Sequence, residues 1–116
     1  LHEVPCEYKG ADLSFVAKSC GLSEQEIIRI HSEKEYTVFF LGFLPGFAYM
    51  GTTDARITVA RKEKPLEIKA GDIGLAGNQT GIYPSASPGG WQIIGRTNTI
   101  PHFRAGDRVR FISVPA

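Results

Sequence analysis

The sequence predicts a mainly β domain, a barrel or sandwich with two short helices, and three observations support this. The 116 residues include 13 glycines and 7 prolines, a surplus that favours the many tight turns of a sheet-rich fold. Segments typical of strands dominate the chain after residue 35. Hydrophobic residues make up 42% of the chain, which is enough for one core at this length. A disordered tail is therefore excluded, and a long helical bundle is not expected.

Two short helices are expected near the N-terminus. The first follows Asp12, a residue type suited to an N-cap, and its apolar residues recur at helical spacing until Gly21. The second opens with Ser23 and Glu26, the S-x-x-E capping box, in which each side chain binds a free amide of the first turn. It ends at His31, whose protonated ring would suit the negative end of the helix dipole, so a capping role is favoured over the alternative of a catalytic one.

Strands are expected over most of the remaining chain. Residues 4–8 are typical of an edge strand, because Pro5 cannot donate to a central ladder. The unbroken apolar and aromatic run at 36–41 indicates a strand buried on both faces. Further strands are expected at residues 57–60, 66–68, 72–76, 81–83, 91–94 and 108–114.

Glycines mark the joints between these strands. Seven of the 13 glycines lie between Gly71 and Gly95, where a barrel needs bends and close backbone approach. Two similar tetrapeptides, KAGD at 69–72 and RAGD at 104–107, each turn into a strand. Two copies of a turn do not make a repeat protein.

Composition and charge exclude several classes of function. The 13 basic residues nearly balance the 12 acidic ones, for a net charge of +1, which argues against a nucleic-acid binder. No stretch approaches the ~20 apolar residues that span a bilayer, and we recognise no signal peptide. Cys6 and Cys20 lack metal-binding spacing. We therefore expect a cytoplasmic protein with buried, reduced thiols, no metal and no membrane partner.

Three glycine-rich stretches are candidates for a binding site. In 41–51, aromatic residues alternate with glycine and either wall a ligand site or fold the loop over the core. In 77–84, amides and a hydroxyl either face a small polar ligand or satisfy local backbone. In 87–97, Arg96 stands where a strand leaves the core and either binds an anionic group or is an ordinary surface arginine. None of the three has the spacing of a Walker loop.

These stretches together resemble the KipI-type proteins, a family also called allophanate hydrolase subunit 1 or the B subunit of 5-oxoprolinase. The motifs that carry the resemblance are FLGFLPGFAYMG at 40–51, AGDIGLAGNQTGIYP at 70–84 and SPGGWQIIGRT at 87–97. They span nearly the whole chain but only the second half of such a protein. The resemblance implies that residues 1–116 form a single cyclophilin-like β-barrel and that the family's smaller N-terminal α/β domain is absent. The start at Leu1 without an initiator methionine agrees with a fragment.

The resemblance implies two alternative functions. The first is that of the B subunit in an ATP-dependent 5-oxoprolinase, which opens 5-oxo-L-proline to L-glutamate together with the A and C subunits. ATP would be used by the complex, since no complete nucleotide site is visible in this chain. The second is a binding module that inhibits the autophosphorylation of a sporulation histidine kinase. Similar paired domains occur in urea carboxylase, and in each case the barrel docks against a related one with a cleft between them.

The resemblance also assigns residues to that cleft. The residues assigned to catalysis are Gln79, Arg96 and His31, and those assigned to substrate or partner binding are Phe43, Pro45, Phe47, Tyr49, Arg61, Thr80, Tyr83 and Trp91. In the enzyme interpretation, Arg96 orients the carboxylate of 5-oxoproline or a phosphoryl group, and Gln79 and Thr80 hydrogen-bond the lactam. The aromatic residues exclude water.

The chain departs from the family pattern in several places. Ala60 stands where the family has proline before the arginine of the middle loop, and Leu66 stands where a second arginine is usual. Any charge clamp that used the second arginine is therefore in doubt. The loops at 8–12 and 97–102 are also short for the family.

Overall fold

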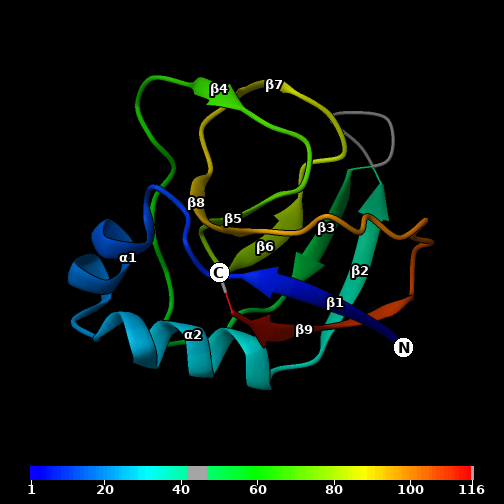
Figure 1. Ribbon diagram of the computed structural model, residues 1–116, viewed down its shortest axis with the longest axis horizontal. Helices are drawn as coiled ribbons and strands as arrows, with labels where there is room; N and C mark the ends of the chain where they lie inside the picture. The colour runs from blue at the N-terminus through cyan, green and yellow to red at the C-terminus, as the bar shows by residue number, and fades with distance from the viewer. Residues whose placement is uncertain (42–46, 116) are drawn as a thin grey trace.

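Seven strands of the described chain close into a barrel (Figure 1). The computed structural model describes residues 1–41 and 47–115. The barrel strands are β1 His2–Glu7, β2 Tyr36–Leu41, β3 Ala48–Gly51, β5 Asp72–Ala76, β6 Gln79–Ile82, β8 Gln92–Arg96 and β9 Arg108–Val114. They follow the order β1-β8-β5-β6-β3-β2-β9 around the barrel. The predicted mainly β barrel with two helices is confirmed.

A separate small sheet lies beside the barrel. It pairs β4 (Leu66–Ile68) with β7 (Ser87–Gly89) in antiparallel register. The strands β3 and β7 were not predicted, because their glycine and proline residues are more typical of turns. Residues 57–60 form no strand. Ile57 and Val59 are buried, but pairing is limited to one isolated bridge from Val59 to Gly77.

β1 closes the barrel, and the prediction of an edge strand at 4–8 is wrong. β1 pairs in parallel with β9 from His2 to Glu7, and its other side pairs with β8 through Glu7 and Arg96. The paired residue on the β8 side lies two positions past Pro5, so the missing amide of Pro5 interrupts no described pair there. A closed barrel removes the edge that the proline was expected to mark.

The two helices begin where the sequence predicts. α1 (Leu13–Cys20) ends at Gly21, which has a left-handed φ of 69°, and α2 (Glu24–Glu33) begins with the predicted capping box of Ser23 and Glu26. Asp12 occupies the N-cap position of α1 without capping the helix. Its carboxylate instead accepts a hydrogen bond of 2.7 Å from the amide of Ile93. No helix in the described part of the chain has the length and apolar character to cross a membrane.

β2 is buried on one face, so the prediction of burial on both faces is wrong for its described side chains. Tyr36 and Val38 point into the core, whereas Thr37 and Phe39 are exposed. The barrel wall has only one inner face, and side chains alternate across it. The ring of Phe39 covers Gly51 on the neighbouring strand, where an added Cβ would meet it at 2.6 Å.

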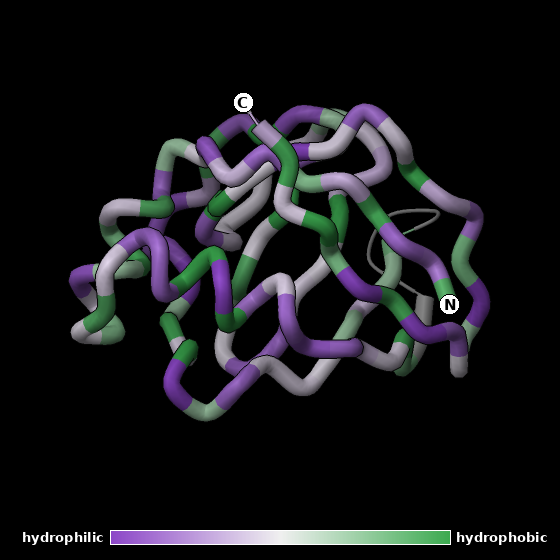
Figure 2. The backbone as a smooth tube through the Cα atoms, turned by 60° about the horizontal axis from the view of Figure 1, so that its bottom comes forward, coloured by the Kyte–Doolittle hydropathy of each residue, from purple (hydrophilic) through white to green (hydrophobic). Residues whose placement is uncertain are grey.

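The buried side chains form two clusters. The larger fills the barrel and the space under the helices, and includes Val4, Ile27, Tyr36 and Phe111. The smaller lies under the β4–β7 sheet and consists of Phe47, Ile68, Ala76, Tyr83, Trp91 and Ile93. Hydrophobic residues recur along the backbone between hydrophilic ones, without a long hydrophobic stretch (Figure 2).

Candidate functional site

A groove brings together five of the residues that the resemblance assigns to a site. Two hollows of about 400 and 200 Å³ share Tyr49, Arg61 and Trp91 as walls. The first hollow extends to Gln79 and the second to Tyr83. The remaining lining residues are Pro65, Ala76, Gly77, Asn78, Pro88, Gly89 and Gly90. We call this surface the aromatic groove.

Strand register and backbone hydrogen bonds position the walls of the groove. Gln79 begins β6 opposite Gly51 of β3. Arg61 lies in the connection between β3 and β4, and both of its neighbours in sequence are held. The amide of Lys62 donates to the carbonyl of Gly90 at 2.7 Å, and the side chain of Gln92 donates to the carbonyl of Ala60 at 3.1 Å. These hydrogen bonds on either side of Arg61 fix the position of its backbone beside the groove.

Phe47 supports the groove from beneath. It is fully buried, and its ring centre lies 4.9 Å from that of Tyr49, 5.0 Å from Tyr83 and 5.3 Å from Trp91. The contacts with Tyr83 and Trp91 are edge-to-face, an arrangement that aromatic quadrupoles favour. Phe47 therefore orients the groove's aromatic walls.

Arg61 gives the groove its charge. It is the one charged side chain among the described residues that line the two hollows. Its guanidinium forms no hydrogen bond or ion pair within residues 1–41 and 47–115. Burial raises the pKa of Tyr83, so its phenol stays protonated at neutral pH. The groove is thus suited to a small ligand with one negative group and several polar atoms.

His31 and Thr80 lie in the interior, away from the groove, and both side chains are fully buried. Thr80 Oγ1 donates its proton to the carbonyl of Gly74 at 2.9 Å, so it must accept from His31 Nε2 at 3.0 Å. His31 Nδ1 then accepts from the Tyr8 hydroxyl at 2.6 Å. Burial lowers the pKa of His31 to about 3.

The prediction of a protonated His31 at the helix end is therefore wrong, because the ring is neutral and faces the core. The expected contact of Thr80 with a lactam is also wrong in this fold, since no ligand reaches a fully buried hydroxyl that already has two partners. Neither residue touches the surface on which a substrate would lie.

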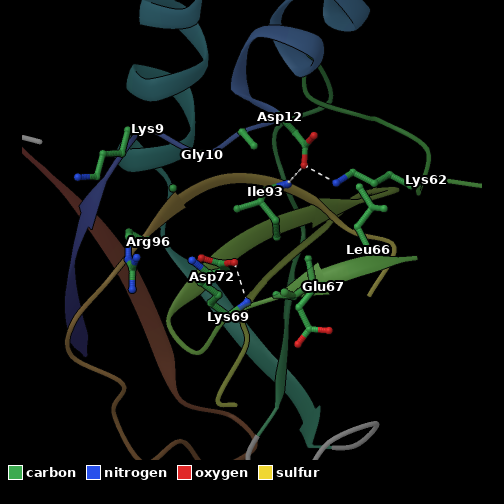
Figure 3. Close-up of a pocket in the computed structure, with 13 residues that line it drawn as sticks. Lys9, Gly10, Asp12, Lys62, Leu66, Glu67, Lys69, Asp72, Ile93 and Arg96 are labelled. Atoms are coloured by element: carbon green, nitrogen blue, oxygen red, sulfur yellow. Dashed lines mark hydrogen bonds and ion pairs between the residues drawn. The ribbon is translucent and has the colours of Figure 1, made fainter. Parts of the chain in front are cut away.

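Arg96 and Gln79 lie near opposite ends of β5, so the structure does not bring these two residues together, and their joint binding of one substrate stays a prediction. Arg96 pairs with Asp72 at the start of β5, whereas Gln79 pairs with Ala76 at its end. Four residues of extended strand separate these levels by roughly 13 Å. Arg96 lines a different pocket, shown in Figure 3. Phe43 and Pro45 lie outside the described residues.

Sequence reasoning left seven of the residues that line the groove unassigned, among them Asn78, Pro65 and Pro88. Asn78 stands beside Gln79 in the same motif, and its side-chain amide is of the type that binds a small polar ligand. The sequence left the alternative of a local turn equally open. Pro65 and Pro88 line the second hollow. Nothing local distinguishes them from turn prolines, because their position depends on the pairing of β4 with β7.

The described residues show no metal centre, and the aromatic groove does not fit a triphosphate. No group of three or more His, Cys, Asp or Glu side chains among them is placed to hold a metal ion. The groove has one cation and hollows of about 400 and 200 Å³, whereas a triphosphate is bound by a glycine-rich loop, a lysine and a magnesium ion. The lining of the aromatic groove therefore does not fit ATP.

Comparison with known proteins identifies clear relatives. A family model described as carboxyltransferase domain, subdomain C and D, matches residues 1–110. A protein from Escherichia coli O157:H7, named as the B subunit of 5-oxoprolinase, is 45% identical over 95% of this chain and 56% of its own length. A Bacillus subtilis protein of the same name is 45% identical over 97% of this chain and 52% of its own. The chain thus spans a little more than half the length of these curated relatives.

Solved structures share the fold. A conserved uncharacterised protein of Pyrococcus horikoshii matches with a TM-score of 0.89 and 47% identity, over 97% of this chain and 58% of that one. The Kluyveromyces lactis urea carboxylase matches with a TM-score of 0.82 at 16% identity, over 97% of this chain and 14% of that one. The second likeness is one of fold alone. The family resemblance drawn from the three motifs is confirmed by the sequence matches.

Proposed function

The chain belongs to the family of carboxyltransferase domains, subdomains C and D, and on that basis we propose that it acts as the B subunit of an ATP-dependent 5-oxoprolinase. The complex would open 5-oxo-L-proline to L-glutamate together with the A and C subunits. The names of the curated relatives support this proposal. The free state of Cys6 and Cys20 agrees with a cytoplasmic complex.

The observation that carries the proposal is the chemistry of the aromatic groove. 5-Oxoproline has one carboxylate and one lactam on a small ring. Arg61 would bind the carboxylate through parallel hydrogen bonds, and Gln79 would donate to or accept from the lactam. Tyr49 and Trp91 would pack against the ring. Arg61 thus takes the part that the sequence suggested for Arg96.

The chain's own residues would bind, orient and shield the lactam. Opening it is difficult because amide resonance must be lost, and ATP would supply the driving force in the complex. Since the aromatic groove does not fit ATP, we infer that the nucleotide and the groups that react with it belong to the other subunits. The groove is open to solvent, and docking of the related barrel of the C subunit over it would exclude water.

Reconstitution tests both the function and the site. The full-length protein is combined with the purified A and C subunits, and ATP-dependent glutamate formation is followed. Arg61→Gln is expected to lower kcat/KM for 5-oxoproline by roughly 10- to 100-fold, because a charge-assisted hydrogen bond to the substrate is lost. Arg29→Gln is the matched control, since Arg29 is an exposed helix arginine paired with Glu33.

The two outcomes that contradict the proposal are distinct. If the unaltered three-subunit mixture forms no glutamate, the function is wrong. If it does and Arg61→Gln reacts at the unaltered rate, the function stands and the groove is not the substrate site. Inhibition of a histidine kinase stays a prediction from resemblance, since no contact in the structure favours it.

A further inference from the structure

A second pocket lies at the other end of β5 from the aromatic groove. It has a volume of about 360 Å³ and opens between the turn at residues 9–12 and strand β4 (Figure 3). Arg96 and Asp72 pair where β5 begins, and both line the pocket. We call it the Arg96 pocket. It shares no lining residue with the aromatic groove, and it plays no part in the function proposed above.

Part of the charge in the Arg96 pocket is already neutralised. Asp12 Oδ2 lies 2.8 Å from Lys62 Nζ, and the side chains of this pair are less than one-fifth exposed. Asp72 Oδ2 accepts a hydrogen bond of 2.9 Å from the backbone amide of Lys69. Lys9 is paired with Glu7 at 3.0 Å. The groups in these pairs are already neutralised or hydrogen-bonded, so a ligand would bind to the unpaired charged groups of the pocket.

Arg96 and the ammonium of Lys69 are the cations available to a ligand. Neither side-chain cation forms an ion pair or hydrogen bond within residues 1–41 and 47–115. Glu67 carries the third carboxylate of the lining, and Figure 3 places it across the pocket from Arg96. An anionic group bound at Arg96 therefore lies away from the carboxylate of Glu67.

The remaining lining is apolar. Leu66 is 56% exposed at the mouth of the pocket, whereas Ile68 and Ile93 are buried in its wall. A leucine in this setting gains from being covered by an apolar group. Sites for small organic molecules combine a mostly apolar wall with a few directed polar groups in volumes of roughly 300–1,000 Å³.

We propose that the Arg96 pocket binds a small organic monocarboxylate, with its carboxylate on Arg96 and Lys69 and its apolar body against Leu66 and Ile93. The planar guanidinium of Arg96 suits a carboxylate held by two parallel hydrogen bonds. The volume of about 360 Å³ admits a short chain or a single ring.

Titration of isotope-labelled protein with hexanoate, followed by amide NMR shifts, tests this proposal. Saturating shifts are expected at Gly10 and Ile93, and the indole of Trp91 in the groove stays unchanged. Hexanoate should bind roughly tenfold more tightly than butanoate, because it buries two more methylenes. Hexanol and inorganic phosphate should each bind at least roughly tenfold more weakly than hexanoate, since one lacks the charge and the other the apolar body.

Substitutions test which residues bind the carboxylate of the ligand and which bind its apolar body. Arg96→Gln is expected to weaken hexanoate binding roughly tenfold, while Arg61→Gln in the groove leaves it unchanged. Leu66→Ser should remove the preference for hexanoate over butanoate. If Arg96→Gln does not fold, as judged from its amide spectrum, the affinities of Lys69→Gln and Leu66→Ser for hexanoate test the proposal instead.

Three results would overturn the proposal. The first is no saturating shift at Gly10 and Ile93. The second is unaltered hexanoate affinity in folded Arg96→Gln and Lys69→Gln. The third is phosphate affinity equal to that of hexanoate, which would indicate a site for any anion.

Discussion

Single residues in the barrel interior tie its stability to pH, and His31 shows this most directly. Its ring stacks on Phe111 at 4.7 Å between ring centres, and both ring nitrogens have buried hydroxyl partners. Protonation would turn Nδ1 into a donor facing the proton of Tyr8 and would place a charge in the core. The neutral ring is therefore part of the folded state.

We predict that acid destabilises the protein through His31. Its pKa is about 3 when folded and about 6.5 in an unfolded chain. Between these values the unfolded state binds more protons, so the free energy of unfolding falls as pH falls, by about 1.4 kcal/mol per pH unit. Urea denaturation of the unaltered protein and of His31→Gln from pH 7 to pH 4 would measure this.

Gln at position 31 can still accept from Tyr8 and donate to Thr80, so it serves as a control that does not titrate. Carboxylates with a lowered pKa, such as Asp107, titrate equally in both proteins and cancel in the comparison. The stability advantage of His31 should shrink towards low pH. A difference that is constant with pH would contradict the prediction.

At the scale of elements, the two similar tetrapeptides form the same turn. Asp72 and Asp107 each donate their amide to the carbonyl three residues back, and each carboxylate accepts that residue's amide at 2.9 Å. Gly71 and Gly106 have φ values of 89° and 91°, the region that the third residue of a type II turn requires. The surroundings of the two glycines differ. A Cβ on Gly71 would meet the carbonyl of Thr97 at 2.2 Å, whereas nothing lies within 4 Å at Gly106.

We predict that alanine is tolerated at one turn and not at the other. Gly106→Ala should cost about 1–2 kcal/mol, since only the left-handed backbone is penalised. Gly71→Ala should cost roughly 3 kcal/mol or more, because the new methyl also displaces the Thr97 backbone. Urea midpoints of the two variants give the comparison. Equal losses would show that the contact with Thr97 relaxes freely.

Local patterns predict those elements whose cause is local. The capping box of α2, the left-handed Gly21 and the strands at 72–76 and 108–114 each depend on neighbouring residues and match the structure. The strands β3 and β7 are not predicted by local patterns. Their residues include glycine or proline, which are held in a strand here only through pairing with strands distant in sequence. The site shows the same limit. Arg96 and Gln79 are separated by the register of β5 with its two neighbours, which no short stretch of sequence contains.

At the scale of the whole molecule, β1 links the ends of the chain into one cooperative unit. It pairs with β9 over six residues and also with β8, and Val4 and Cys6 on its inner face are fully buried. Burial raises the pKa of Cys6 to about 12, so its thiol remains neutral and packs as a small apolar group. Both pockets depend on this closure, because β8 carries Arg96 and follows Trp91.

We therefore predict that a cavity in β1 weakens the entire barrel. Val4→Ala should cost roughly 2 kcal/mol, and amide hydrogen exchange should speed up in β5 and β6 as much as in β1, since an open barrel leaves no stable sheet. Glu3→Ala is the matched control, because Glu3 is exposed and its pair with Arg110 contributes at most about 1 kcal/mol. If faster exchange is confined to β1 and β9, the pairing between these two strands opens without the rest of the barrel. The aromatic groove and the Arg96 pocket would then lose stability independently, and hexanoate affinity in Val4→Ala would fall while the groove stays intact.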